Sequence, residues 1–535
     1  MKDWNTNQDF FNFSRGRFVC DEEYNMSIRR VCFDMNQLAR VATEAITANK
    51  CINVEKCPDG LYNKSYLFTM DDGRQVIGKV PNLNAGVPHF TTASEVATMD
   101  FVRNILETPA PHVYAWNSKA DNPVGSEYII MEKMPGVQLS QVWDHMKPTD
   151  KVLVVIQLFR LQKKWLSTRF TNIGGLYYAV DVEAGASSAP LFTDSAGKEV
   201  RDDRFAIGPT NGRDWVDAAR SSLKCDRGPW TSISDYYQAI LHREINATKS
   251  AARLPKQMVM LCAPTLYEPT REKKLAALER TASVVRNLIP SDASMCASHI
   301  WHNDLHDENI FVDPANPTKI TGIIDWQSSL AAPLFENTID PGFLNYDGPG
   351  IETLDKPVLP ENFDDLSAAE KNAALELSYS QALLVAYRRL IQKKTPLKLA
   401  SEFQASTAYD ILKLSRRIFE VGEAHVLAIL TTLESEWGDL PAVRQAGGPN
   451  CPLNFSESEL EQIEEDVEAA DAGIQAMDTI RKRLGRLWPD KGAVQTQQYD
   501  ETKRLLREVK QELLHSLKLD DEDARVFEEL WPFDE

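Results

Sequence analysis

One segment near the middle of the chain constrains the fold more than any other: HIWHNDLHDENIFVDPANPTKITGIIDWQ, residues 299–327. Its apolar runs NIFVD and KITGIID are separated by DPANPT, whose residue types favour a turn. The segment therefore predicts a β-hairpin. Asn309 enters the first strand and Asp325 leaves the second, so the hairpin brings these two side chains together, while Asp304 precedes them in a loop positioned by His302.

These residue types, in this order, indicate phosphoryl transfer. The amide oxygen of Asn309 and the carboxylate of Asp325 are hard oxygen donors of the kind that Mg²⁺ prefers. Asp304, just outside that pair, can orient a substrate hydroxyl or accept its proton. A single Asp in a loop is usually a solvated turn residue, but the combination H-x-D-x4-N followed by an apolar strand ending in Asp is uncommon. His306 has no second ligand at metal-binding spacing, so we expect it to hydrogen-bond within the loop.

The N-terminal half has the pattern of a small antiparallel sheet. SYLFTM and QVIGKVP flank an Asp-Gly turn, and HVYAW and SEYIIMEKMPG predict two further strands, with a helix expected over 91–106. Lys79 lies in the apolar strand QVIGKVP, where an unpaired ammonium is costly. Glu95 lies sixteen residues further on, in the predicted helix. We therefore expect Lys79 to bind phosphate while paired with Glu95, as such strand lysines do in phosphotransferases.

Two further parts of the nucleotide site are predicted from position alone. The loop CPDGLYNKSYLF should lie over the nucleotide, and since it has one glycine, the backbone amides near Asn63, Lys64 and Ser65 are expected to bind the phosphates. The strand ending IIMEKMPG should pass the back of the cleft. There the backbone from Met131 to Lys133 is expected to bind the adenine edge.

The order of elements predicts an α+β fold of two lobes with a cleft between them. Residues 1–50 form an N-terminal arm and helix, 51–136 a sheet-rich N-lobe, 137–365 a C-lobe with a helical insertion and the catalytic loop, and 366–535 a helical extension. Within the C-lobe, residues 137–298 are expected to be mainly helical, and the clearest helix is KVLVVIQLFRLQKKWLSTRF.

HNDLHDENIFVD followed by GIIDW resembles the aminoglycoside phosphotransferase-like (phosphotransferase enzyme) family, which shares the protein-kinase-like fold. The strand lysine, the helix glutamate, the EKMPG linker, H-x-D-x4-N and IIDW follow in the family's order over about 60–330. FFNFSRGRF, NIGGLYY and CDRGPW resemble a fungal subgroup typified by altered inheritance of mitochondria protein 9.

The resemblance implies ATP and Mg²⁺ as cofactors. By matching position it implies Asp304 as catalytic base, Asn309 and Asp325 as Mg²⁺ ligands, and Lys79 paired with Glu95 as the phosphate contact. It also implies a protein-kinase-like fold with a small N-lobe, a large helical C-lobe and an extra helical tail.

The expected function is an ATP- and Mg²⁺-dependent transfer of phosphate to a hydroxyl of a small molecule, with 205–230 and 328–347 as candidate walls of the acceptor site. The acidic composition is compatible with a cationic acceptor. The alternative is a nucleotide-binding, pseudokinase-like regulatory or scaffold protein. A protein kinase is disfavoured, since D-F-G, A-P-E and a G-x-G-x-x-G loop are all missing from the sequence.

Composition limits partners and location. The net charge of −19 argues against nucleic acid and anionic membrane surfaces, both of which need a basic face. The eight Cys form no C-x-x-C pair, which is typical of reduced thiols, and no apolar run approaches the length that spans a bilayer. We expect a cytoplasmic protein without integral membrane association, or a mitochondrial one if a presequence is missing. The oligomeric state is left open.

Overall fold

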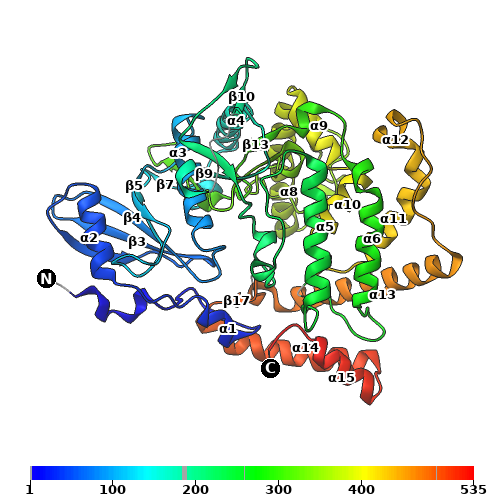
Figure 1. Ribbon diagram of the computed structural model, residues 1–535. Coiled ribbons are helices and arrows are strands. Elements are labelled where there is room, and N and C mark those ends of the chain that lie inside the picture. Colours follow the sequence, from blue (N-terminus) through cyan, green and yellow to red (C-terminus); the bar gives the residue numbers. More distant parts are fainter. Residues whose placement is uncertain (1–2, 183–188, 258, 490, 535) are drawn as a thin grey trace.

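In the computed structural model, which describes residues 3–182, 189–257, 259–489 and 491–534, the N-terminal strand signals form one five-stranded antiparallel sheet (Figure 1). In spatial order its strands are β2 (Cys51–Lys56), β3 (Asn63–Met70), β4 (Gln75–Pro81), β6 (Tyr128–Glu132) and β5 (Val113–Asn117). Helix α3 (Phe90–Asn104) connects β4 to β5, within two residues of its predicted bounds. Gly73, with φ of +84°, makes the tight turn between β3 and β4 that the Asp-Gly pair predicts.

The aromatic N-terminal arm covers one face of this sheet. Alternate residues of β3 are buried, as a half-covered strand requires. The buried Tyr66 donates its hydroxyl hydrogen to the carbonyl of Phe10 at 2.5 Å and packs edge-on against the Phe10 and Phe33 rings. Helix α2 (Met35–Ala45) packs beside the arm, with its apolar side turned to the same core. The arm therefore completes the N-lobe.

The predicted catalytic hairpin is present. Strands β14 (Ile310–Asp313) and β15 (Asn316–Ile323) pair antiparallel with Ile310 opposite Ile323, and β7 (Val137–Gln138) extends them to three strands. Helix α4 (Pro148–Trp165) packs on β15, and the side-chain oxygen of Gln157 accepts the Ile320 amide hydrogen at 3.2 Å.

The prediction that residues 137–298 are mainly helical is wrong in part. They supply five of the seven strands in a C-lobe sheet whose spatial order is β11-β10-β8-β13-β16-β9-β12. Its strands are β11 (Glu199–Val200), β10 (Phe192–Asp194), β8 (Thr168–Phe170), β13 (Ser298–Ile300), β16 (Leu330–Pro333), β9 (Gly174–Tyr178) and β12 (Phe205–Gly208). The helix expected to reach Phe170 ends at Trp165, and the strand β8 follows it. Strands of two to five residues carry too little periodicity to be recognised in the sequence.

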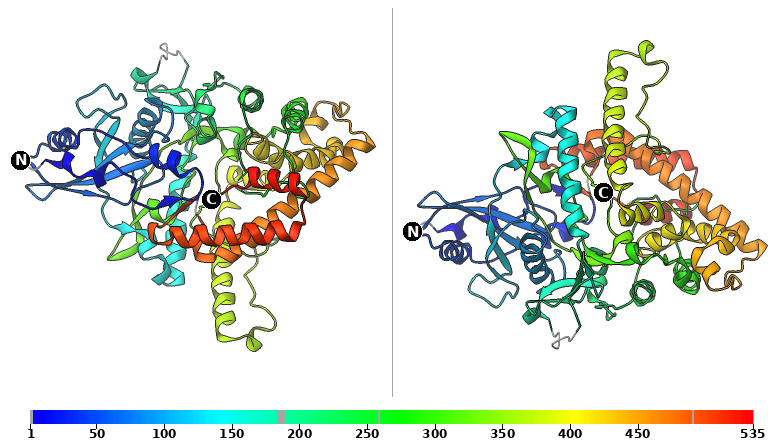
Figure 2. Two further views of the ribbon diagram at one scale, coloured as in Figure 1. Left: turned by 90° about the horizontal axis from the view of Figure 1, so that it is seen from below. Right: turned by 90° about the horizontal axis from the view of Figure 1, so that it is seen from above.

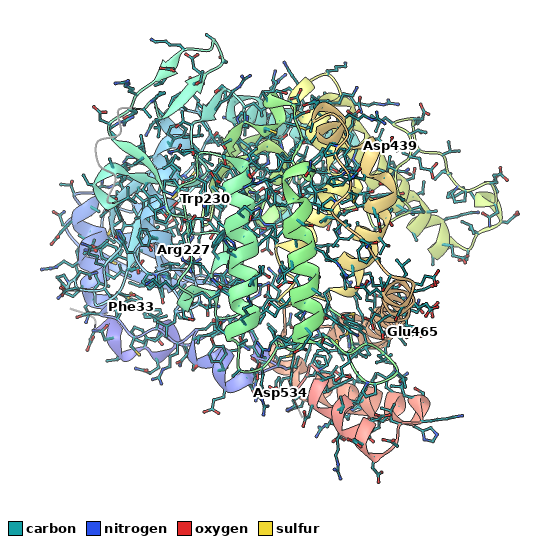
Figure 3. All side chains as sticks on the ribbon, turned by 45° about the vertical axis from the view of Figure 1, so that its right-hand side comes forward. Phe33, Arg227, Trp230, Asp439, Glu465 and Asp534 are labelled. Carbon is teal, nitrogen blue, oxygen red and sulfur yellow. The ribbon has the colours of Figure 1, made fainter. Side chains whose placement is uncertain are left out.

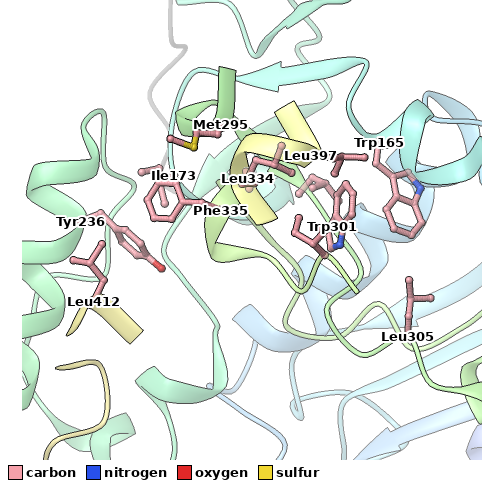
Figure 4. Close-up of a cluster of buried hydrophobic side chains, with 14 of the residues drawn as sticks. Trp165, Ile173, Tyr236, Met295, Trp301, Leu305, Leu334, Phe335, Leu397 and Leu412 are labelled. Atoms are coloured by element: carbon pink, nitrogen blue, oxygen red, sulfur yellow. The ribbon is translucent and has the colours of Figure 1, made fainter. Parts of the chain in front are cut away.

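Buried tryptophans of the C-lobe core hold the predicted catalytic loop and hairpin in position. Trp301 precedes the catalytic loop and Trp326 follows Asp325, and both are fully buried. Their rings pack edge-on against Trp165 of α4, with ring centres 5.1 and 5.6 Å apart. Figure 4 shows Trp165 and Trp301 in this apolar cluster, which continues to Leu334 and Leu397. The loop and hairpin are therefore anchored to one rigid core.

Helices make up most of the remaining regular structure, and α8 projects from the body (Figure 2). The longer helices are α5 (Ile233–Ser250), α6 (Arg271–Leu288), α8 (Ala368–Ile391), α11 (Ala424–Glu436), α13 (Glu457–Leu484) and α14 (Tyr499–Leu517). The shorter ones are α7 (Ala293–Cys296), α9 (Thr395–Phe403), α10 (Thr407–Ser415), α12 (Pro441–Gln445) and α15 (Asp521–Leu530). Among the described residues, none of these helices has the length and apolarity needed to cross a membrane. The chain thus has the predicted α+β, protein-kinase-like fold of two lobes and a helical tail, with an additional sheet in the C-lobe.

A segment near the N-terminus, residues 17–22, contacts the C-terminal part of the chain beneath the lobes. Strand β1 (Arg17–Phe18) pairs with β17 (Ala493–Val494), and the Asp534 carboxylate accepts the Asp21 and Glu22 amide hydrogens at 2.8 and 3.0 Å, where α1 (Glu22–Ser27) begins (Figures 1 and 3). At Gly16 any Cβ would lie 2.0 Å from the Val494 carbonyl oxygen, so only glycine allows this approach. The N-terminal arm therefore links the N-lobe to the helical tail.

Candidate active site

Lys79 on β4 joins the two lobes through a pair of carboxylates. Its ammonium donates to Glu95 of α3 at 2.6 Å and to Asp325 beyond β15 at 2.8 Å. The side chains of Lys79 and Glu95 are 7% and 4% exposed, whereas that of Asp325 is 39% exposed. The structure therefore brings together three predicted site residues from three separate elements, and leaves Asp325 open on one side.

The electrostatics of this triad favour a bound cation. Burial alone would lower the Lys79 pKa, but the charges of Asp325 and Glu95 raise it above its ordinary value. Burial raises the Glu95 pKa against the opposing effect of Lys79. Burial would also raise the Asp325 pKa, but the charge and hydrogen bond of Lys79 outweigh it, so the Asp325 pKa is lowered. One ammonium faces two carboxylates, so this site attracts positive charge.

The catalytic loop is tied to the residue before Asp325. The buried ring of His302 makes a 2.8 Å hydrogen bond to the Ile324 carbonyl, and the Ile324 amide donates to the carbonyl of Asn309 at 3.0 Å. Asp325 itself has φ of +62°, in the left-handed region, which turns its side chain out of the strand direction. The predicted contribution of His302 to the loop is seen directly in these contacts.

Asp304 is the most exposed of the predicted site residues that carry a carboxylate, with 72% of its side chain accessible. The His306 imidazole lies 3.5 Å from its carboxylate; this hydrogen bond and the imidazole charge lower the Asp304 pKa and raise that of His306. Lys491, in the segment before β17, adds a smaller effect in the same direction on Asp304. Asp304 is therefore ionised at neutral pH and open to a substrate hydroxyl.

Asn309 and Asp325 are the two residues predicted to bind magnesium. The Asn309 amide nitrogen donates to the Asp304 carbonyl at 3.0 Å and lies 3.1 Å from a His306 ring nitrogen, which leaves its amide oxygen as the possible ligand. One amide oxygen and one carboxylate suit Mg²⁺, which retains several waters and needs few protein ligands. Among the described residues no cluster of three or more His, Cys, Asp or Glu side chains could hold a metal.

The three residues predicted to bind phosphate through backbone amides lie within β3. Ser65 is directly opposite Lys79 on the same face of the hairpin, and the Asn63 side-chain nitrogen donates to Gln327 at 2.6 Å. The Lys64 side chain points to the opposite, fully buried face, where its ammonium contacts Asp59 at 3.4 Å. Its side chain is therefore separated from the Lys79 face, and the role of the three amides stays a prediction.

The predicted adenine-binding residues lie where β6 ends. Met131 pairs with Ile77 of β4 and Val113 of β5, so it is a central position of the sheet. Lys133, one residue beyond the strand, is exposed, and its ammonium donates to the side-chain oxygen of Gln75 at 2.9 Å. The binding of adenine by their backbone stays a prediction.

Asp59 and Arg213 hold the predicted nucleotide loop in place through contacts that sequence reasoning missed. The Asp59 carboxylate, fully buried, accepts from the Ser14 amide and hydroxyl, both at 2.7 Å, and from Lys56 at 2.6 Å. From the C-lobe, the Arg213 guanidinium lies 3.9 Å from the centre of the Tyr62 ring. Arg213 belongs to the predicted acceptor wall. Its contact with Tyr62 and the contact of Asp59 with Ser14 have no signal in the sequence, since each joins segments distant in the chain.

Three comparisons place the chain among known proteins. The model of the family described as "Phosphotransferase enzyme family" matches residues 53–336, more than half of the 535 residues. A subtelomeric hrmA-associated cluster protein of Aspergillus fumigatus is 28% identical over 478 residues, 81% of this chain and 88% of that protein. Altered inheritance of mitochondria protein 9, mitochondrial, of Yarrowia lipolytica is 28% identical over 399 residues, 68% of this chain and 65% of that protein.

Among solved structures, the apo form of a thermostable mutant of aminoglycoside phosphotransferase APH(4)-Ia is 13% identical with a TM-score of 0.33, covering 74% of this chain and 98% of that one. A putative fructosamine-3-kinase from Thermobifida fusca is 13% identical with a TM-score of 0.35, covering 77% of this chain and 99% of that one. Likenesses at these TM-scores carry no argument about acceptor or activity.

Proposed function

Because this chain belongs to the phosphotransferase enzyme family, we propose that it transfers the γ-phosphate of ATP, with Mg²⁺, to a hydroxyl of a small molecule. The observation that supports this most is the position of Lys79, held between Glu95 at 2.6 Å and Asp325 at 2.8 Å across the two lobes. An ammonium has three N–H donors. Two are taken by these carboxylates, and the third is available to a phosphate oxygen.

The other site residues take complementary roles in the proposed reaction. Mg²⁺ bound to Asn309 and Asp325 would neutralise charge on the phosphates. Asp304 orients the acceptor hydroxyl and accepts its proton as the acceptor oxygen bonds to the γ-phosphorus and the bond to the leaving ADP oxygen breaks. His306 keeps Asp304 ionised, as the lowered Asp304 pKa indicates, so the carboxylate is in the form that can accept this proton.

A thermal-shift experiment tests the nucleotide half of the proposal. Mg²⁺-ATP at a hundred times its Kd should stabilise the protein by about 2.7 kcal/mol through binding linkage. In Asp325→Ala this shift should disappear, because the variant loses a metal ligand. The exposed Asp121, changed to Ala, is the matched control and should keep the full shift. An Asp325→Ala protein that still shows the wild-type shift would contradict the metal assignment.

A regulatory or scaffold protein that binds nucleotide without turnover is the second candidate. The observation that favours it is the long helical extension, in which α8 projects from the body and exposes Leu377 and Tyr379 at 39% and 55% (Figure 2). Such a projection is suited to a partner protein. Thermal stabilisation by Mg²⁺-ATP without phosphate transfer to any metabolite would support this candidate over the enzyme.

The location of the protein stays open between two alternatives. The composition favours the cytoplasm, and a relative whose name includes "mitochondrial" favours mitochondria. Fluorescent tagging of the full-length gene product, scored against a mitochondrial dye, distinguishes them.

A further inference from the structure

The two lobes are joined at a second point beside the Lys79–Asp325 ion pair, where Gln327 of the C-lobe bonds to the N-lobe. Its side-chain oxygen accepts from the Asn63 side-chain nitrogen at 2.6 Å. Its side-chain nitrogen donates to the Ala85 carbonyl at 2.7 Å. Both ends of the Gln327 amide are therefore engaged across the lobe boundary.

The Asn63–Gln327 contact lies on the face of the N-lobe sheet that carries Lys79. In the β3–β4 pair Ser65 is directly opposite Lys79. Asn63 is two residues before Ser65, and alternate residues of a strand point to the same face, so Asn63 shares the face of Lys79. Gln327 likewise lies two residues after Asp325, the C-lobe partner of Lys79. The two interlobe contacts are therefore neighbours, and the second is next to the predicted phosphate site.

A third interlobe contact comes from Arg213 in the C-lobe. Its guanidinium donates to the carbonyls of Asn84 and Ala85 at 2.8 and 2.9 Å. The same guanidinium lies 3.9 Å from the centre of the Tyr62 ring. The Ala85 carbonyl thus accepts hydrogen bonds from both Arg213 and Gln327. We call these N-lobe contacts of Arg213 and Gln327 the interlobe clasp.

On the N-lobe side, the clasp engages two loops that are bonded to each other. One is the predicted nucleotide loop, which meets β3 just after Tyr62, and the other is the loop that follows β4. The Asn82 amide donates to the Tyr62 carbonyl at 2.8 Å, and the Asn84 side-chain nitrogen donates to the Leu61 carbonyl at 3.3 Å. A contact with either loop therefore restrains the nucleotide loop.

On the C-lobe side, the clasp residues are anchored to the core. The residue after Arg213 is Asp214, whose carboxylate is bonded by Arg243 and Arg416, both at 2.9 Å. The Arg243 side chain is 0% exposed. The other clasp residue directly follows Trp326, which is fully buried. Because the clasp is fixed on this side, any opening between the lobes has to break its contacts with the N-lobe loops.

We propose that Arg213 and Gln327 are positioning residues that hold the predicted nucleotide loop closed over bound nucleotide, and that opening of the interlobe clasp limits the release of ADP. This inference rests on the proposed function, in which Lys79 binds a phosphate of the nucleotide. A loop that covers a nucleotide has to lift before the product leaves, and such opening limits turnover in many enzymes. Here lifting the loop breaks four hydrogen bonds and one cation–π contact.

The test measures the release of a fluorescent ADP analogue from the full-length protein in Mg²⁺, by stopped flow against excess unlabelled ATP. Gln327→Ala removes two hydrogen bonds and should speed release at least about tenfold, the change expected for one net hydrogen bond of about 1.4 kcal/mol. Tyr62→Leu removes the ring beside Arg213 and should speed release about threefold. Tyr62→Phe keeps the ring and should release the analogue at the wild-type rate, as should the exposed control Asn49→Ala.

A double variant tests whether Tyr62 acts through Arg213. Arg213→Lys keeps the positive charge but loses the planar guanidinium that packs on the ring. It should speed release by itself, and adding Tyr62→Leu should have no further effect, because both substitutions remove the same contact. Effects that multiply in the double variant would overturn the assignment of the ring contact to the clasp.

The outcomes separate this inference from the proposed function. Wild-type release rates in folded Gln327→Ala and Tyr62→Leu proteins overturn the inference, whereas their retained binding of the analogue shows that the nucleotide half of the proposed function stands. A wild-type protein that does not bind the analogue contradicts the proposed function itself, and the clasp inference with it. The Tm without nucleotide checks folding, and since Tyr62 is half-buried, its variant remains informative if Gln327→Ala fails to fold.

Discussion

Replacing Asp59 by Asn should destabilise the N-lobe and release the N-terminal arm. The carboxylate is 0% exposed and contacts Lys64, also 0% exposed, at 3.4 Å, and Lys56 at 2.6 Å. In the variant the Lys56 ammonium would keep two carbonyl acceptors, at 2.6 and 2.9 Å. The Lys64 ammonium would keep one, the Asn12 carbonyl at 3.0 Å. The Asp59→Asn substitution would therefore leave one buried ammonium without a counter-charge.

The magnitude follows from that unpaired charge. Removing one partner of a buried ion pair costs about 3–5 kcal/mol. Burial already lowers the Lys64 pKa to about 8, so loss of the carboxylate drives it lower, and the lysine can lose its proton near neutral pH. Because this deprotonation removes the unpaired charge, we expect the substitution to lower the free energy of unfolding by about 3 kcal/mol, the lower limit of that range. For a cooperative unit of about 150–250 residues this lowers Tm by about 6–12 °C.

The assay is thermal unfolding followed by tryptophan fluorescence. Asp72→Asn is the control, because its partner Arg74 and Asp72 itself are 51% and 39% exposed, and such surface pairs contribute about 0–1 kcal/mol. Asp59→Asn combined with Lys64→Met should recover most of the loss, since it removes both buried charges. A Tm for Asp59→Asn within about 1 °C of wild type, or no recovery in the double variant, would refute the reasoning.

Two further predictions concern the catalytic loop and its pH dependence. Asp304→Asn should keep the thermal shift with Mg²⁺-ATP but reduce phosphate transfer at least about 100-fold, the range attributed to general base catalysis; transfer at the wild-type rate would exclude the base role. Burial lowers the His299 pKa from 6.5 to about 4. As the pH drops, His299 therefore takes up a proton in the unfolded chain before it does so in the folded protein. The free energy of unfolding should fall by about 3 kcal/mol as the pH drops from 6.5 through 4. Urea unfolding of His299→Gln should show a smaller fall in the free energy of unfolding over that pH range. A fall equal to that of the wild-type protein would assign the effect to other groups.

Part of the site could be read from the sequence because its determinants are local. The catalytic hairpin depends on two apolar runs and one turn, and it pairs Ile310 with Ile323 as expected. The Lys79–Glu95 contact joins two consecutive elements, so a strand lysine in an apolar run followed by a helix with an acidic residue was enough to predict it. The roles of these residues in binding ATP and Mg²⁺ remain predictions.

Only the tertiary structure decided the surroundings of that site. The C-lobe strands are two to five residues long and gain stability from partners far away in the chain, as when Phe170 pairs with Ser298. The arm–tail pairing at Gly16, the contact of the buried Asp59 with Ser14 and the Arg213 contact with Tyr62 likewise join distant segments. Turn chemistry and periodicity act over a few neighbouring residues, whereas these contacts depend on which surfaces packing brings together. The sequence by itself therefore determined the phosphate-transfer segment, and the folded chain determined what surrounds it.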